Sequence, residues 1–181
     1  MKTSKPRTGR PTSRLRSLRT PPRKAKIIDL VPALISIRSI LVPVDFSETS
    51  TKAVHYAIRM AEQFGAKIVL MNVVEPIVTP DFAYPMLLEP DKLKAAAKEK
   101  LEALSRDIGL PGKINRCLVR SGAPFAEITD AARALNVDLI ILATHGYTGL
   151  KHVLMGSTAE RVVRHAPCPV LTVREKEHEF I

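Results

Sequence analysis

A glycine-rich segment, ATHGYTGLKHVLMGST (143–158), contains residue types that can bind phosphate. Glycine allows a backbone to approach a ligand closely and to adopt positive φ angles. Ser157 stands three residues before Glu160, which is the spacing of a capping box and predicts a helix with Ser157 as its cap. A helix N-terminus offers free N–H groups and the positive end of the helix dipole. The segment therefore predicts either a phosphate site at Gly156, Ser157 and Thr158 or a plain glycine-rich turn.

The better-known phosphate signatures are missing from the chain. The pair Gly112-Lys113 lacks the upstream glycine and the following hydroxyl of G-x-x-x-x-G-K-[ST]. No G-x-G-x-x-G follows the first apolar run. These two observations argue against a P-loop ATPase and against a dinucleotide-dependent dehydrogenase.

Asp45 and Ser47 form a second candidate group, at the end of the apolar run SIRSILVPVD (36–45). In an open α/β sheet, ligands bind beyond the carboxyl ends of the strands. If this strand neighbours the apolar strand VDLIILAT (137–144), Asp45 and the glycine-rich segment face one crevice. The alternative is that Asp45 only caps the helix that follows it.

The elements that must position these groups alternate along the chain. Apolar, β-branched runs predict strands at 36–45, 67–75, 113–122, 137–144 and 169–174. Helical spacing predicts helices at 47–65, 91–109, 123–136 and 159–166, with Gly65 ending the first and Pro124 in the first turn of the third. The proline-rich stretch 75–90 is expected to be a surface loop. Strands joined by helical crossovers predict a doubly wound, Rossmann-like α/β fold with a parallel sheet.

The net charge of +10 comes from one end of the chain. Residues 1–26 carry ten Lys or Arg and no acid, whereas residues 27–181 hold 18 basic and 18 acidic side chains. We expect a disordered basic extension (1–35), a folded domain (36–175) and a short C-terminal tail (176–181). The extension has four open interpretations: weak contact with nucleic acid or an anionic surface, organelle targeting, a solvated appendage, or a start assigned too early.

The remaining composition favours a cytoplasmic protein. No run of 18 apolar residues occurs, so no transmembrane segment is expected. Cys117 and Cys168 do not form a disulfide framework or a metal-binding pattern, and we expect structural thiols in a reducing compartment.

Three motifs resemble the universal stress protein family over about residues 36–175: ILVPVDFSE (40–48), the THG–TGL–GS series (144–157) and HAPCPVLTVR (165–174). The resemblance implies a UspA-like domain with a five-stranded parallel sheet of order 3-2-1-4-5. It also implies a stress-response protein that acts through conformational or partner effects. Family members commonly form homodimers through the last strand, here with Val170, Leu171, Thr172 and Val173 at the centre.

The ATP-binding branch of that family carries G-x-x-G-x9-G-[ST]. On this chain the pattern falls on Ala143, Gly146, Gly156 and Ser157, so alanine replaces the first glycine. The resemblance implies ATP as ligand, with Mg²⁺ held indirectly by Asp45 through water. The residues implied to bind the nucleotide are Pro43, Val44, Asp45, Val73, Leu142, Ala143, His145, Gly146, Gly156, Ser157 and Thr158. His145 either contacts the ligand or holds the loop by a hydrogen bond.

We therefore expect an ATP-binding regulatory protein with at most weak ATP hydrolysis. No general base is paired with a nucleophile in these motifs, and no arginine lies in the glycine-rich segment to stabilise a transferring phosphoryl group. Two alternatives stay open: a slow ATPase, and a nucleotide-free homodimeric interaction module, which the alanine at position 143 favours.

Overall fold

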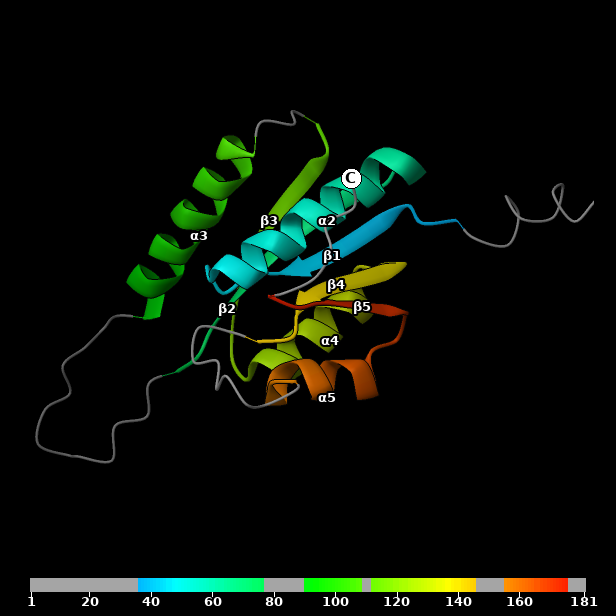
Figure 1. Ribbon diagram of the computed structural model, residues 1–181. Helices are drawn as coiled ribbons and strands as arrows, with labels where there is room; N and C mark the ends of the chain where they lie inside the picture. Colours follow the sequence, from blue (N-terminus) through cyan, green and yellow to red (C-terminus); the bar gives the residue numbers. More distant parts are fainter. Residues whose placement is uncertain (1–35, 77–89, 109–111, 146–154, 176–181) are drawn as a thin grey trace, which may run out of the picture. The chain divides into compact units, whose positions relative to one another are not determined.

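The computed structural model describes residues 36–76, 90–108, 112–145 and 155–175, all within the unit that runs from Ile35 to Ile181. The basic extension, most of the proline-rich stretch, Gly146 and the C-terminal tail lie outside the described residues. The elements alternate as expected (Figure 1): β1 (Ser39–Pro43), α2 (Glu48–Phe64), β2 (Lys67–Val74), α3 (Pro90–Asp107), β3 (Ile114–Ser121), α4 (Pro124–Ala134), β4 (Leu139–Ala143), α5 (Ser157–His165) and β5 (Val170–Val173).

The five strands form one sheet in the order β3-β2-β1-β4-β5, and every neighbouring pair is parallel. The fold expected from the sequence is confirmed. β1 is the central strand, because Ile40 pairs with Ile68 of β2 on one side and with Leu139 of β4 on the other. The carboxyl ends of β1 and β4 therefore meet, as the crevice argument required.

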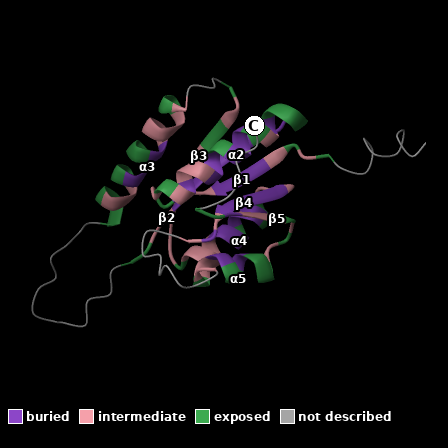
Figure 2. Ribbon diagram, in the orientation of Figure 1, coloured by how far each residue is buried: buried purple, intermediate pink, exposed green. Residues whose placement is uncertain are grey.

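Helices cover both faces of the sheet (Figure 1): α2 and α3 lie on one face, and α4 and α5 lie on the other. Side chains alternate between these faces along each strand. Ile40, Leu70 and Ile141 join the apolar cluster under α2, while Leu41 and Ile140 join the cluster under α4 and α5. The central strands are consequently buried on both faces (Figure 2), which explains their continuous apolar sequences.

The boundaries of α2 follow from its sequence. Its buried residues recur at helical spacing, and its N-cap Ser47 accepts a hydrogen bond from the Ser50 backbone N–H at 3.1 Å. Gly65 ends the helix in the left-handed conformation, with φ of 69°. The predicted stop at Gly65 is confirmed.

Candidate functional site

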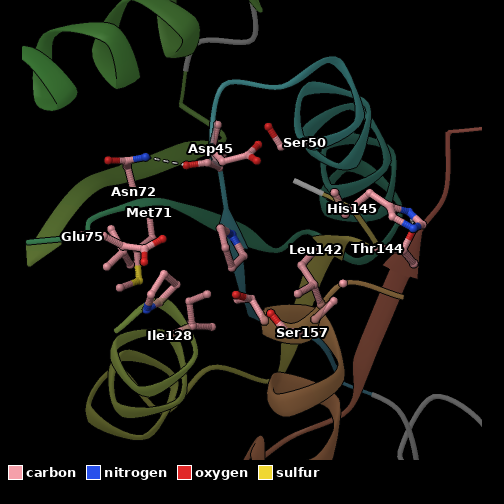
Figure 3. Close-up of a pocket in the computed structure, with 18 residues that line it drawn as sticks. Asp45, Ser50, Met71, Asn72, Glu75, Ile128, Leu142, Thr144, His145 and Ser157 are labelled. Carbon is pink, nitrogen blue, oxygen red and sulfur yellow. Dashed lines mark hydrogen bonds between the residues drawn. The ribbon is translucent and has the colours of Figure 1, made fainter. Parts of the chain in front are cut away.

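A pocket of about 290 Å³ opens at the carboxyl edge of β1, β2 and β4, where these strands meet the first turns of α2, α4 and α5 (Figure 3). It brings together the described residues that were expected to bind nucleotide, which are Pro43, Val44, Asp45, Val73, Leu142, Ala143, His145, Gly156, Ser157 and Thr158. Gly146 lies outside the described residues. The pocket also includes residues that sequence reasoning missed, namely Ser50, Met71, Asn72, Glu75, Pro124, Ile128, Thr144 and Ala159.

One wall of the pocket is apolar. Met71, Ile128 and Leu142 belong to the core cluster under α4 and α5, and Val73 packs against it. These side chains come from β2, α4 and β4, so the wall exists only once the crossover has placed α4 on the sheet. A flat apolar group of a ligand would bury its surface here.

The polar end of the pocket is the N-terminus of α5. The Gly156 N–H donates to the Thr144 carbonyl at 2.7 Å, which ties the helix start to the end of β4. A Cβ at Gly156 would lie 3.1 Å from that carbonyl oxygen. Close backbone packing therefore already explains the glycine, whether or not a ligand is bound.

We expected Ser157 to cap α5 through a capping box with Glu160, and this assignment is wrong. The N-cap is Gly156, and Glu160 instead pairs with Arg164 at 2.7 Å. The hydrogen bond from Gly156 to Thr144 starts the helix one residue earlier than the capping-box spacing suggested. Ser157 therefore lies in the first helical turn and lines the pocket.

Asp45 lies at the rim of the pocket and holds the start of α2. Its Oδ1 accepts hydrogen bonds from the Ser47 backbone N–H at 3.1 Å and from Ser47 Oγ at 2.6 Å. The alternative that Asp45 itself caps α2 is wrong, because Ser47 is the N-cap. Phe46 lies between the two in a left-handed conformation, with φ of 66°.

Strand alternation puts the methyl group of Ala143 on the α2 face of the sheet. Leu139 and Ile141, which share its parity along β4, both belong to the cluster under α2. Leu142, of the opposite parity, lies in the cluster with α5. The methyl group of Ala143, which stands where a glycine was expected, is thus on the sheet face opposite to α5.

A model of the universal stress protein family matches residues 36–174. The chain belongs to the universal stress protein family. It is 34% identical to universal stress protein MJ0531 of Methanocaldococcus jannaschii over 146 residues, covering 78% of this chain and 85% of that protein.

Two solved structures support the same family fold. The structure of MJ0577, also from M. jannaschii, is 30% identical, with a TM-score of 0.64, and the match covers 80% of this chain and all of that one. A universal stress protein solved in complex with cAMP matches with a TM-score of 0.57 and 22% identity, covering 78% and 100%. At that identity the second likeness concerns the fold alone.

In this family member, the His145 ring Nδ1 lies 3.0 Å from Thr144 Oγ1. Figure 3 shows the ring turned toward Thr144 and away from Asn72 and Glu75. The Thr144 N–H donates to the Val173 carbonyl at 2.8 Å, so His145 is attached to the end of the β4–β5 pair. Its expected contact with a ligand stays a prediction.

The charged side chains that line the pocket in the described part of this universal stress protein are two carboxylates, Asp45 and Glu75. An anionic ligand would rely there on the backbone N–H groups and hydroxyls at the start of α5.

None of the described helices combines the length and apolar character needed to cross a membrane.

Proposed function

We propose that this universal stress protein binds ATP in the pocket and acts as a nucleotide-dependent regulatory protein. The observation that carries the proposal is the pairing of an apolar wall with a helix N-terminus inside one pocket, at the point where β1 and β4 meet. Adenine needs an apolar surface and phosphate needs N–H donors, and Figure 3 shows Met71, Ile128 and Leu142 around the same pocket as Ser157.

In the proposed arrangement, adenine packs against Met71, Val73 and Ile128. Asp45 accepts hydrogen bonds from the ribose hydroxyls, as a carboxylate at the rim is able to do. The phosphates lie over Ser157 and Thr158, where backbone N–H groups of the first helical turn have no partner within the helix.

Mg²⁺ is compatible with this arrangement. The described residues contain no group of three or more His, Cys, Asp or Glu that could hold a metal on its own. Mg²⁺ often keeps several waters and is held by one or two carboxylates together with substrate phosphates. Asp45 is the carboxylate that would contact such a water, and the ion would neutralise phosphate charge.

The rival proposal of a nucleotide-free interaction module rested on Ala143. Because Ala143 shares the α2 face of β4 with Leu139 and Ile141, we infer that its methyl group leaves the space in front of α5 open, although Ala143 also lines the pocket. This geometry favours nucleotide binding over the rival. We further propose a cytoplasmic location and a homodimer.

Ser157→Asp tests the proposal without threatening the fold. An acidic residue in the first turn favours a helix, because it complements the helix dipole, but it would repel phosphate. Asn115→Asp adds the same charge at an exposed position of β3, outside the pocket, and serves as control.

Isothermal calorimetry with ATP gives the readout for both variants. We expect at least a tenfold loss of affinity for Ser157→Asp and no change beyond about twofold for the control, since one close charge repulsion is worth about 1.4 kcal/mol or more. Equal affinities in the two folded variants would refute a phosphate site at α5. Gly156→Val is less suitable, because its side chain would press on the Thr144 carbonyl.

A further inference from the structure

Asn72 is a polar residue in the interior of an apolar strand. It follows Leu70 and Met71 of β2, which are fully buried, and it is itself only 9% exposed. Burying an amide is costly unless the group is hydrogen-bonded, so the partner of Asn72 identifies what the residue contributes.

The Asn72 amide binds the residue that precedes Asp45. Its Nδ2 donates to the Val44 carbonyl at 2.8 Å, which is the dashed line in Figure 3. The Val44 N–H donates to the Met71 carbonyl at 2.7 Å. Both backbone groups of Val44 are therefore fixed by β2 at a point where β1 has already ended at Pro43.

The chain is also fixed on the other side of Asp45. Phe46 adopts the left-handed conformation that a bulky side chain rarely takes, and its ring packs against the core cluster under α2. Lys100 of α3 places its Nζ 5.8 Å from the centre of that ring. Ser47 then donates two hydrogen bonds to the Asp45 carboxylate.

We propose that Asn72 is a positioning residue, which sets the place of the Asp45 carboxylate for the ribose hydroxyls of a nucleotide. The inference rests on the proposed nucleotide function. Without the amide donor, the Val44 carbonyl loses its buried partner and the peptide between Val44 and Asp45 is free to rotate. The hydrogen bonds that the carboxylate accepts from the ribose hydroxyls depend on its placement to within about half an ångström, so they would weaken.

The test compares ATP with 2′,3′-dideoxy-ATP, which lacks the two ribose hydroxyls. The ratio of their dissociation constants reports the contacts to ribose and cancels contributions from base and phosphates. We expect wild type to favour ATP by roughly tenfold or more, as hydrogen bonds to a charged group imply. Asn72→Leu, which keeps the branched shape and removes the donor, should bring the ratio close to one, because affinity for ATP should fall more than affinity for the dideoxy analogue.

Two further variants make the outcome specific. Asp45→Asn keeps an acceptor for Ser47 but removes the charge, and we expect it to lower the ratio. Combined with Asn72→Leu, it should lower the ratio no further, because both act on one contact. Thr129→Val removes another buried hydrogen bond to backbone, within α4 and outside the pocket, and should keep the wild-type ratio.

A wild-type ratio in folded Asn72→Leu would overturn the inference while leaving ATP binding intact. Equal losses for both nucleotides would also overturn it, since they would show a purely structural role. If the leucine variant does not fold, Asn72→Ser, which is too short to reach the Val44 carbonyl, is measured in the same way. Absence of ATP binding by wild type would overturn the proposed function and this inference together.

Discussion

Ala143 stands where the family resemblance led us to expect the first glycine of a nucleotide-binding motif. Because its methyl group lies on the α2 face of β4, we expect Ala143→Gly to change ATP affinity by no more than about twofold. Glycine within a strand should cost the fold roughly 0.5–1 kcal/mol through backbone entropy. Calorimetry and urea unfolding measure the two effects. A tenfold gain in affinity would show that the methyl group obstructs the ligand after all.

The two cysteines lie outside the pocket lining, in β3 and before β5. Burial raises the pKa of Cys117, and the nearby Glu102 carboxylate adds to the effect. Burial, with Asp138 second, likewise raises the pKa of the Cys168 thiol. We therefore expect iodoacetamide, which reacts with thiolate, to label both more slowly than a peptide thiol at pH 8.

The pH dependence of this labelling follows from the same shifts. In the native chain, the labelling rate should still increase with pH at pH values above the ordinary cysteine pKa. The folded state keeps the two thiol protons to higher pH than the unfolded state does. The folding free energy is therefore most favourable at pH values below the cysteine pKa of the unfolded chain. This part of the folding stability is lost as the pH rises from the cysteine pKa of the unfolded chain to that of the folded chain. A native rate that matches the peptide at every pH would contradict the raised pKa values.

Residues at strand ends were predictable from the sequence, because the carboxyl edge of a parallel sheet is where ligands bind. This reasoning placed Asp45 in the pocket, whereas Val73 and Leu142 came from the family resemblance. Asn72 was missed, although an amide within an apolar run is itself a signal. Ile128 was missed for another reason: it reaches the pocket only through the packing of α4 on the sheet, which helical periodicity does not specify.

At the scale of elements, the end of α2 depends on a left-handed residue. Gly65 has φ of 69°, and a Cβ built there would meet no atom within 4 Å. Gly65→Ala should therefore destabilise the fold through backbone conformation alone, by roughly 1–2 kcal/mol in urea unfolding. Gly65→Asn should cost clearly less, because asparagine tolerates this conformation, as Asn136 does after α4 with φ of 47°. Equal losses for the two variants would contradict this explanation.

The strand boundaries show what local patterns leave out. The predicted strand 137–144 is observed as Leu139–Ala143; its start is delayed because the Asp138 carboxylate accepts hydrogen bonds from the backbone N–H groups of Arg38 and Ser39. The contact joins positions about a hundred residues apart, so no local pattern contains it. The start of α5 also depends on a contact outside the local pattern. The hydrogen bond from the Gly156 N–H to the Thr144 carbonyl makes Gly156 the N-cap.

At the scale of the whole molecule, β5 is an edge strand with half-buried Val170, Leu171 and Thr172. An apolar edge invites pairing with a second copy, whereas the opposite edge, β3, exposes Asn115 and Arg116. We propose that two chains pair through β5 about a two-fold axis.

The hydrogen-bond pattern selects the residue that tests this dimer. Pro169 and Val173 direct their carbonyls to β4, accepting from Ile140 and Thr144, so the alternate residue Thr172 directs its backbone groups to the free edge. Thr172→Pro should keep the fold and give a monomer in light scattering at tens of micromolar, where wild type and Thr172→Val are dimers. Proline at Val173 would instead disturb the β4–β5 pair. A folded, dimeric Thr172→Pro would exclude β5 as the interface.

The strand order itself was not derivable from periodicity, which indicates alternation and parallel crossovers but not which strands adjoin. The order 3-2-1-4-5 came from the family resemblance, and the structure confirms it. The role of the basic extension stays a prediction, since residues 1–35 lie outside the described residues.

The central claim is that ATP occupies the pocket between the apolar wall and α5. A titration of ¹⁵N-labelled full-length protein with Mg²⁺ and ATP, followed by two-dimensional NMR, tests both the binding and its location. We expect saturable shifts in the amide signals of Val73, Gly156, Ser157 and Thr158, with β3 and the C-terminal end of α2 unchanged. An unchanged spectrum at millimolar ATP, or shifts confined to residues outside the pocket, would contradict the claim.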